Sequence, residues 1–85
     1  MKLRVLYFAS LREKLGKDAE EIEVPADVAT VAGLRSHLQR LGSSYENAFS
    51  EKALIRAAVN QDMVQGEAAI GAGDEVAFFP PVTGG

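Results

Sequence analysis

A single apolar stripe with helical spacing limits the possible folds of this sequence more than any other pattern. The stripe consists of Val31, Leu34, Leu38 and Leu41. This i, i+3, i+7, i+10 spacing is typical of a helix that buries one face. Thr30 is suited to cap its first turn and Gly42 to end it. Around this one main helix, the other apolar residues fall into short segments with the character of strands.

Four segments have the alternation or the β-branched and aromatic content of strands. They are residues 2–8 (KLRVLYF), 20–24 (EEIEV), 54–59 (LIRAAV) and 75–79 (EVAFF). Turns are predicted at Asn60-Gln61-Asp62, before a short Met63-Val64 segment, and at residues 71–74. Strands around one main helix predict an α+β fold, with the helix packed on one face of a mixed sheet.

Two further segments are shorter or less regular. Ser10-x-x-Glu13 has the pattern of a capping box, and with a stop at Gly16 it predicts a short helix over residues 10–15. Residues 43–52 are polar and irregular, with Tyr45 and Phe49 as their anchors.

Size and composition narrow the class of the protein. With 85 residues, 47% of them hydrophobic, the chain forms one domain with a modest core. A net charge of −3 without a basic run argues against nucleic-acid binding, and no apolar run approaches the ~20 residues that span a bilayer. The chain has no cysteine, which excludes disulfides and thiolate metal sites. We expect a soluble, cytoplasmic protein that contacts neither nucleic acid nor membrane.

The side chains offer no evident catalytic centre. His37 is the only histidine and flanks the apolar stripe, so we assign it a structural or solvated role. Glu20, Glu21 and Glu23 are expected to line a solvated strand edge. The glycines between residues 66 and 73 precede a strand, whereas a phosphate-cradling loop precedes a helix. No bound cofactor and no metal site are predicted.

One face of the predicted sheet has surplus apolar residues. If the main helix covers only the other face, Leu6, Phe8 and Phe79 stay uncovered, and the adaptable Met63 can join them. An apolar patch on a small domain indicates a docking site for a partner. The alternative is that residues 43–52 fold over these side chains.

The chain ends on FFPPVTGG, residues 78–85. Residues 1–79 form the predicted domain and residues 80–85 an extended tail, which reaches at most about 20 Å. Prolines stiffen the base of this tail, and glycines remove every side chain from its tip. The tail consists of Pro80, Pro81, Val82, Thr83, Gly84 and Gly85. It is suited to deliver the Gly85 carboxylate into a pocket of a partner.

Four stretches of the sequence show a family resemblance. They are VLYFA (5–9), Leu11-Arg12-Glu13, Ala58-Val59-Asn60 and GDEVAFFPPVTGG (73–85). Through them the chain resembles, over essentially its whole length, the small, sulfur-carrying subunits of molybdopterin synthase, which are β-grasp proteins of the ubiquitin-like superfamily. The resemblance implies a β-grasp fold for residues 1–79.

The resemblance also implies a chemistry for Gly85. An ATP-dependent activating enzyme would join the Gly85 carboxylate to AMP, and sulfur from a donor protein would displace AMP to leave a thiocarboxylate. The large subunit of the synthase would then transfer this sulfur to a pterin precursor of the molybdenum cofactor. ATP belongs to the activating enzyme, and the chain itself acts as the sulfur-donating subunit, without catalytic side chains of its own.

Partners are expected at both the patch and the short helix. A heterotetramer of two small and two large subunits is implied by the resemblance. We assign Phe8, Met63 and Phe79 to the contact with the large subunit. Arg12, on the short helix, is suited to pair with an acidic group of the activating enzyme.

Three alternative interpretations start from the same tail. A ubiquitin-like protein modifier would be joined through Gly85 to lysines of target proteins, again by way of an adenylate. The sulfur carrier of thiazole synthesis also ends in Gly-Gly, but it is shorter and lacks the FFPPV approach. A plain interaction module would leave the stiffness of the tail unexplained.

Overall fold

A computed structural model describes residues 1–81 of the chain. The predicted tail residues Val82, Thr83, Gly84 and Gly85 lie outside the described residues. The elements of residues 1–81 are, in chain order, β1 (Lys2–Tyr7), α1 (Ser10–Leu15), β2 (Ala19–Glu23), α2 (Val31–Gln39), α3 (Ser43–Ala48), β3 (Arg56–Val59), β4 (Asp62–Val64) and β5 (Glu75–Phe79).

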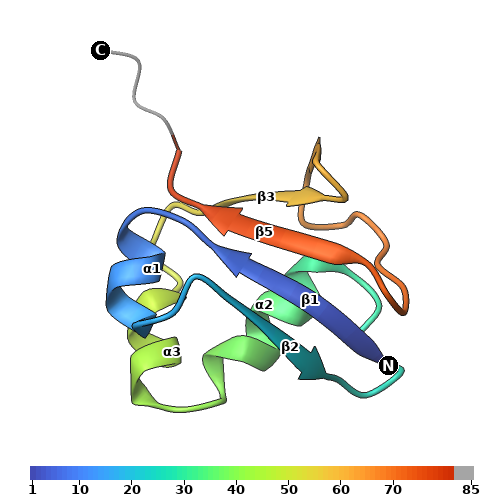
Figure 1. Ribbon diagram of the computed structural model, residues 1–85, viewed down its shortest axis with the longest axis horizontal. Helices are drawn as coiled ribbons and strands as arrows, with labels where there is room; N and C mark the ends of the chain where they lie inside the picture. Colours follow the sequence, from blue (N-terminus) through green and yellow to red (C-terminus); the bar gives the residue numbers. More distant parts are fainter. Residues whose placement is uncertain (82–85) are drawn as a thin grey trace.

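The strands form one mixed sheet in the order β2-β1-β5-β3-β4. β1 and β5 are parallel neighbours near its centre, and the other neighbouring strands are antiparallel. A parallel pair needs a crossover connection, and the intervening α2 and α3 lie on one side of the sheet (Figure 1). The predicted α+β fold, with a mixed sheet and its main helix on one face, is therefore confirmed.

The core lies between the sheet and these helices. Its largest fully buried side chains are Tyr7, Phe49, Phe78, Leu3, Leu34, Leu38, Val5 and Val76. The Phe49 ring meets the rings of Tyr7 and Phe78 edge-on, with centroids 6.1 and 5.2 Å away. Because Tyr7 and Phe78 stand near the carboxyl ends of β1 and β5, this aromatic cluster fixes the end of the sheet from which the tail departs.

The short helix α1 forms where the sequence predicts it, but it begins differently. Ala9, with a φ of 53°, turns the chain out of β1, and no side chain caps the helix. The predicted capping box of Ser10 and Glu13 is therefore wrong, because Ser10 is already the first helical residue and stands past the capping position. Gly16 ends the helix in the left-handed conformation, with a φ of 72°, as expected.

The main helix α2 begins as predicted and ends early. The Thr30 hydroxyl oxygen accepts a hydrogen bond of 3.0 Å from the Gly33 N–H. The helix ends at Gln39, and Leu41 is 45% exposed, so its assignment to the buried stripe is wrong. The Leu41 N–H bonds to the carbonyl three residues back, at Leu38, and this tighter turn moves Leu41 off the stripe. Gly42 precedes α3 and does not end α2.

Residues 43–52 also differ from the prediction, because Ser43–Ala48 form the helix α3. Tyr45, Ala48 and Phe49 have the i, i+3, i+4 spacing of one helix face, and Ala48 and Phe49 are buried. Core packing thus stabilises a helix that its polar sequence did not predict. The third strand is shorter than expected and begins only at Arg56.

Candidate docking face at the base of the tail

The strand β5 leads directly into the tail. It pairs with β1 on one side and with β3 on the other. The pairing continues to its end, since the Phe8 N–H donates to the Phe78 carbonyl at 3.1 Å. Pro80 and Pro81 follow, half-buried, at the end of the sheet where β1 also finishes (Figure 1). The tail therefore starts from a firmly held position.

An apolar row crosses the sheet on the face opposite the helices. The register aligns Leu6 with Ala77, Ala77 with Ala58, and Ala58 with Met63. Residues paired in register stand on the same face of a sheet. The row therefore runs from β1 through β5 and β3 to β4.

Two aromatic residues extend this row towards the tail. Phe8 and Phe79 each lie two positions beyond a member of the row, so they belong to the same face. Phe8 is 46% and Met63 58% exposed, whereas Leu6 and Phe79 are half-buried. We call Leu6, Phe8, Met63 and Phe79 the open-face patch. The structure brings these predicted residues together, and their contact with a partner stays a prediction.

The segment 43–52 does not cover the open-face patch. Its helix α3 packs beside α1 and α2 on the other side of the sheet (Figure 1). Phe49 enters the core from that side. The alternative in which this segment folds over the patch is therefore wrong.

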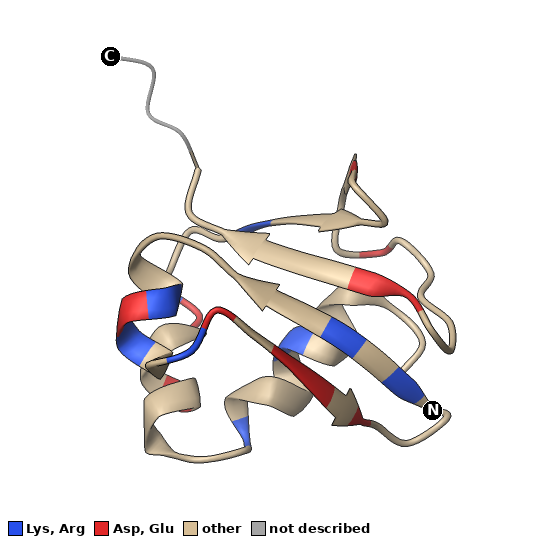
Figure 2. Ribbon diagram, in the orientation of Figure 1, with Lys and Arg blue, Asp and Glu red and all other residues tan. Residues whose placement is uncertain are grey.

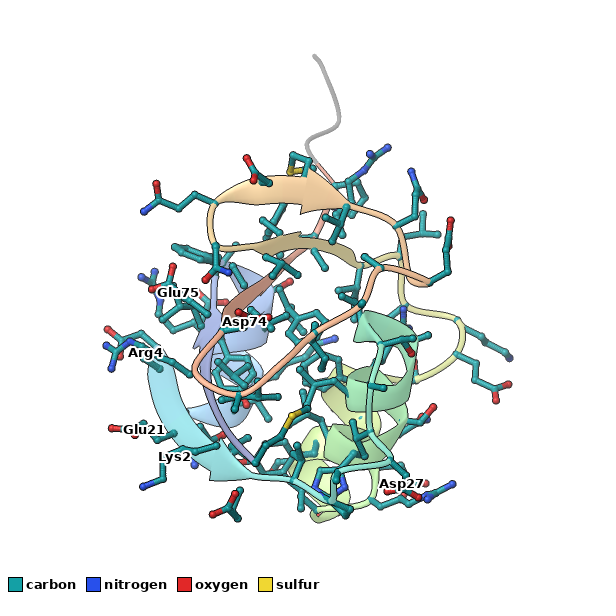
Figure 3. All side chains as sticks on the ribbon, turned by 90° about the vertical axis from the view of Figure 1, so that its right-hand side faces the viewer. Lys2, Arg4, Glu21, Asp27, Asp74 and Glu75 are labelled. Carbon is teal, nitrogen blue, oxygen red and sulfur yellow. The ribbon has the colours of Figure 1, made fainter. Side chains whose placement is uncertain are left out.

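The same face becomes charged away from the tail. Figure 2 shows basic residues at the start of β1 and acidic residues at the start of β5, while the halves of these strands next to the tail are uncharged. Arg4 pairs in register with Glu21 on one side and Glu75 on the other. These side chains project away from α2 (Figure 3). A docked partner would meet an apolar surface near the tail and mixed charge farther away. This difference favours one orientation of the partner on the sheet.

Arg12 lies on α1, directly after the turn that follows β1. Its side chain is exposed. Within residues 1–81 its guanidinium makes no ion pair and no side-chain hydrogen bond. The structure thus places Arg12 at the tail end of the sheet, and its contact with an activating enzyme stays a prediction.

A polar cluster that the sequence did not reveal joins three parts of the fold. Glu20 Oε2 accepts hydrogen bonds of 2.7 Å from both the Tyr7 and the Tyr45 hydroxyls. Lys17 Nζ lies 3.2 Å from Glu20 Oε1 and 3.0 Å from the Tyr45 hydroxyl. Glu20 is therefore half-buried and bonded to β1 and α3, so its assignment to a solvated edge is wrong. Glu21 and Glu23 are exposed, as expected.

The environment of the cluster shifts the pKa values of its members. Burial, and then the hydrogen bond to Glu20, raise the pKa of Tyr7 far above its ordinary value. Burial by itself raises the pKa of Glu20, but the hydrogen bonds from Tyr7, Tyr45 and Lys17 outweigh it and lower that pKa. The Glu20 carboxylate therefore stays ionised and the two tyrosine hydroxyls stay protonated near neutral pH. The cluster exchanges no proton in that range, so its role is to hold β1, β2 and α3 together.

Residues 1–81 contain no group of three His, Asp or Glu side chains positioned to hold a metal ion. None of their helices has the length and apolarity needed to cross a bilayer.

Residues 5–85 match the ThiS family. The chain belongs to the ThiS family. A relative named molybdopterin synthase sulfur carrier subunit, from Escherichia coli (strain K12), is 47% identical over 83 residues, which are 98% of this chain and 99% of the relative. The resemblance to sulfur-carrying subunits of molybdopterin synthase is therefore confirmed.

Solved structures show the same fold for this member of the ThiS family. A putative molybdopterin converting factor, subunit 1, from Pyrococcus furiosus matches with a TM-score of 0.79 and 33% identity over 96% of this chain and 99% of its own. The SAMP1 protein from Haloferax volcanii matches with a TM-score of 0.76 and 28% identity over the full length of both chains. The predicted ubiquitin-like β-grasp fold is confirmed.

Proposed function

We propose that this chain is the sulfur carrier subunit of a molybdopterin synthase and works in the cytoplasm. The observation that supports this most directly is the 47% identity to the Escherichia coli subunit of that name over 98% of the chain. The family match also extends to Gly85. A function that depends on the last residue requires similarity up to that residue.

In this function the terminal carbonyl of Gly85 carries the sulfur. An activating enzyme binds ATP, and the Gly85 carboxylate displaces pyrophosphate to form an acyl adenylate. Sulfur supplied by a donor protein then displaces AMP and leaves a thiocarboxylate. The chain has no cysteine, so a sulfur atom cannot travel on one of its thiols. The chain binds no cofactor, and the adenylating residues belong to the activating enzyme.

Delivery of the sulfur uses the patch and the tail together. The large subunit docks on the open-face patch, and the tail, which spans at most about 20 Å, enters its active site. There the thiocarboxylate transfers sulfur to a pterin precursor, and two such transfers build a dithiolene. Two small and two large subunits form the synthase.

The test is reconstitution with ATP, the activating enzyme and a sulfur source, followed by intact mass spectrometry. The wild-type chain should replace one oxygen by sulfur, whereas a chain lacking Gly85 should not. The shortened terminus stops about 3.5 Å early, and a displacement of ~1 Å already costs about a hundredfold in rate. Thermal unfolding should be unchanged by the deletion. Sulfur transfer from the shortened chain to the pterin precursor would contradict the proposal.

The contact of Arg12 with the activating enzyme has its own test. Arg12→Glu should slow adenylation more than it slows sulfur transfer to the pterin precursor, because it places like charges in contact with the acidic group of the enzyme. Lys14→Glu, on the same helix and with the same change of charge, is the matched control. Equal adenylation rates for the two variants would remove Arg12 from this interface.

A second candidate function is conjugation to proteins. The full-length likeness to SAMP1, whose name abbreviates small archaeal modifier protein 1, favours it. Both functions begin with the Gly85 adenylate, but attack by a lysine amine gives a stable isopeptide. Mass spectrometry of the chain isolated from its own cells separates a thiocarboxylate from an isopeptide conjugate.

A further inference from the structure

A cleft of about 500 Å³ opens on the helix side of the sheet, at the base of the tail. Its lining includes Arg35, Leu54, Arg56, Val64, Phe78 and Pro81. Apolar side chains from α2, β3 and β4 line much of it. Because Pro81 is part of the lining, the cleft and the tail share one border. The cleft lies on the opposite side of the sheet from the open-face patch.

Two arginines, Arg35 and Arg56, contribute to the lining of this cleft. Arg35 Nη2 donates to the carbonyls of Ser50 and Ala53, at 2.7 and 3.0 Å, and so holds the segment that precedes β3. Both bonds start from one nitrogen, so donors on the other two nitrogens of the guanidinium remain. Neither Arg35 nor Arg56 forms an ion pair within residues 1–81.

Arg56 connects the cleft with the open-face patch. It pairs in register with Phe79, so its side chain leaves the sheet on the open face, and it also lines the cleft. It also lines a smaller hollow, together with Met63 and the acidic Glu67, with which it forms no ion pair. Leu54, two residues earlier, is 77% exposed at the cleft, the largest exposure among the large apolar side chains of the described residues. Positive charge and uncovered apolar surface therefore meet beside the tail.

We propose that the large subunit of the synthase contacts the chain on both sides of the sheet at the base of the tail. One of its acidic segments binds in this cleft. The segment places a carboxylate on Arg56 and the free donors of Arg35, and an apolar side chain against Leu54. Guanidinium groups bind carboxylates through paired, charge-assisted hydrogen bonds, which favour an acidic occupant. The cleft is continuous with the proposed docking surface through Arg56 and Pro81, which favours the same partner. This inference rests on the proposed function.

The experiment is titration calorimetry of the large subunit with variants of the chain. Arg56→Glu and Leu54→Ser should each weaken binding at least tenfold, and the loss for Arg56→Glu should shrink in high salt because screening weakens charge interactions. Arg40→Glu and Leu41→Ser, beyond the far end of α2, are matched controls and should stay within twofold. Each variant should keep the wild-type melting temperature, since its side chain is exposed. The same pairs are compared in a chain that ends at Pro81.

The outcomes separate the alternatives. If the wild-type chain binds the large subunit, and Arg56→Glu binds it with the same affinity as the control Arg40→Glu, the cleft is not part of the interface. The proposed function then still stands. If Arg56→Glu strengthens binding of the full chain and leaves the shortened chain unchanged, residues 82–85 of the chain itself occupy the cleft, which also overturns the proposal. If wild type does not bind the large subunit at all, both this inference and the proposed function fail.

Discussion

At the scale of single residues, two neighbouring aromatic side chains of this protein differ sharply in exposure. Tyr7 is 1% exposed, and Phe8, the next residue, is 46% exposed. Successive residues of a strand point to opposite faces, so one enters the core and the other faces solvent. Phe49 is 0% exposed and touches both Tyr7 and Phe78. Burial thus assigns Phe49 to stability and leaves Phe8 free for a partner.

We predict opposite effects for substitutions at Phe8 and Phe49. Phe8→Asp should leave the unfolding free energy within about 1 kcal/mol of wild type and weaken binding to the large subunit by about 2 kcal/mol or more, as for a central aromatic anchor. Phe49→Ala should lower the unfolding free energy by about 3–5 kcal/mol, because it opens a cavity in the core. Urea unfolding and calorimetry measure the two quantities. A cooperative melt lost in Phe8→Asp would place Phe8 in the core and contradict the assignment of the patch.

At the scale of elements, α3 depends on contacts far away in the sequence. It has six residues, and isolated helices shorter than ~12–15 residues are marginal in water. Two contacts hold it: Phe49 in the core and the Tyr45 hydroxyl on Glu20. Since Glu20 also accepts from Tyr7, one carboxylate connects α3 to β1 and β2. The ionisation of Glu20 should therefore affect how firmly α3 is held.

The sign of the resulting pH dependence follows from the lowered pKa of Glu20. A group whose pKa is lower in the folded state stabilises the fold above its unfolded pKa, here 4.5, and this contribution disappears as pH falls through the folded pKa. Urea unfolding of the wild type should therefore show stability falling below pH 4.5, and Glu20→Gln should show a smaller fall. Glu21→Gln, on the neighbouring exposed position, should behave as wild type. If wild type and Glu20→Gln lose the same amount of stability below pH 4.5, this role of the cluster is contradicted.

Sequence reasoning succeeded at this scale where the signal was local. Thr30 and the first three members of the apolar stripe stand where spacing alone places them, and alternation assigned Phe8 and Phe79 to the open face. It failed where the structure depends on contacts between residues that are far apart in the sequence. Tyr7 and Tyr45 are 13 and 25 positions from Glu20, so no short pattern in the sequence brings them together. Leu54 and Arg56 gave no signal either, because their importance comes from a cleft that only the assembled fold creates.

At the scale of the whole molecule, docking and chemistry are assigned to different parts of the chain. The open-face patch, the cleft and Arg12 all lie within residues 1–81, which include the whole sheet and core. The proposed reacting group is the carboxylate of Gly85. The open-face patch and the cleft lie on opposite sides of the sheet, and both border the point where the tail begins. Recognition by the body of the protein should therefore persist without the tip.

A chain that ends at Pro81 should accordingly inhibit sulfur transfer by competing with the thiocarboxylated full-length chain. It retains the docking surfaces, so it should occupy the large subunit, and it lacks the Gly85 carbonyl, so it should deliver nothing. Inhibition of pterin sulfuration should be overcome by excess full-length carrier, and the variants Phe8→Asp and Arg56→Glu of the shortened chain should inhibit at least tenfold more weakly. Its melting temperature should match that of the full chain, since the elements of the core end at Phe79. If the shortened chain fails to inhibit even at a large excess, the binding energy lies in residues 82–85, and the body of the protein only carries the tail.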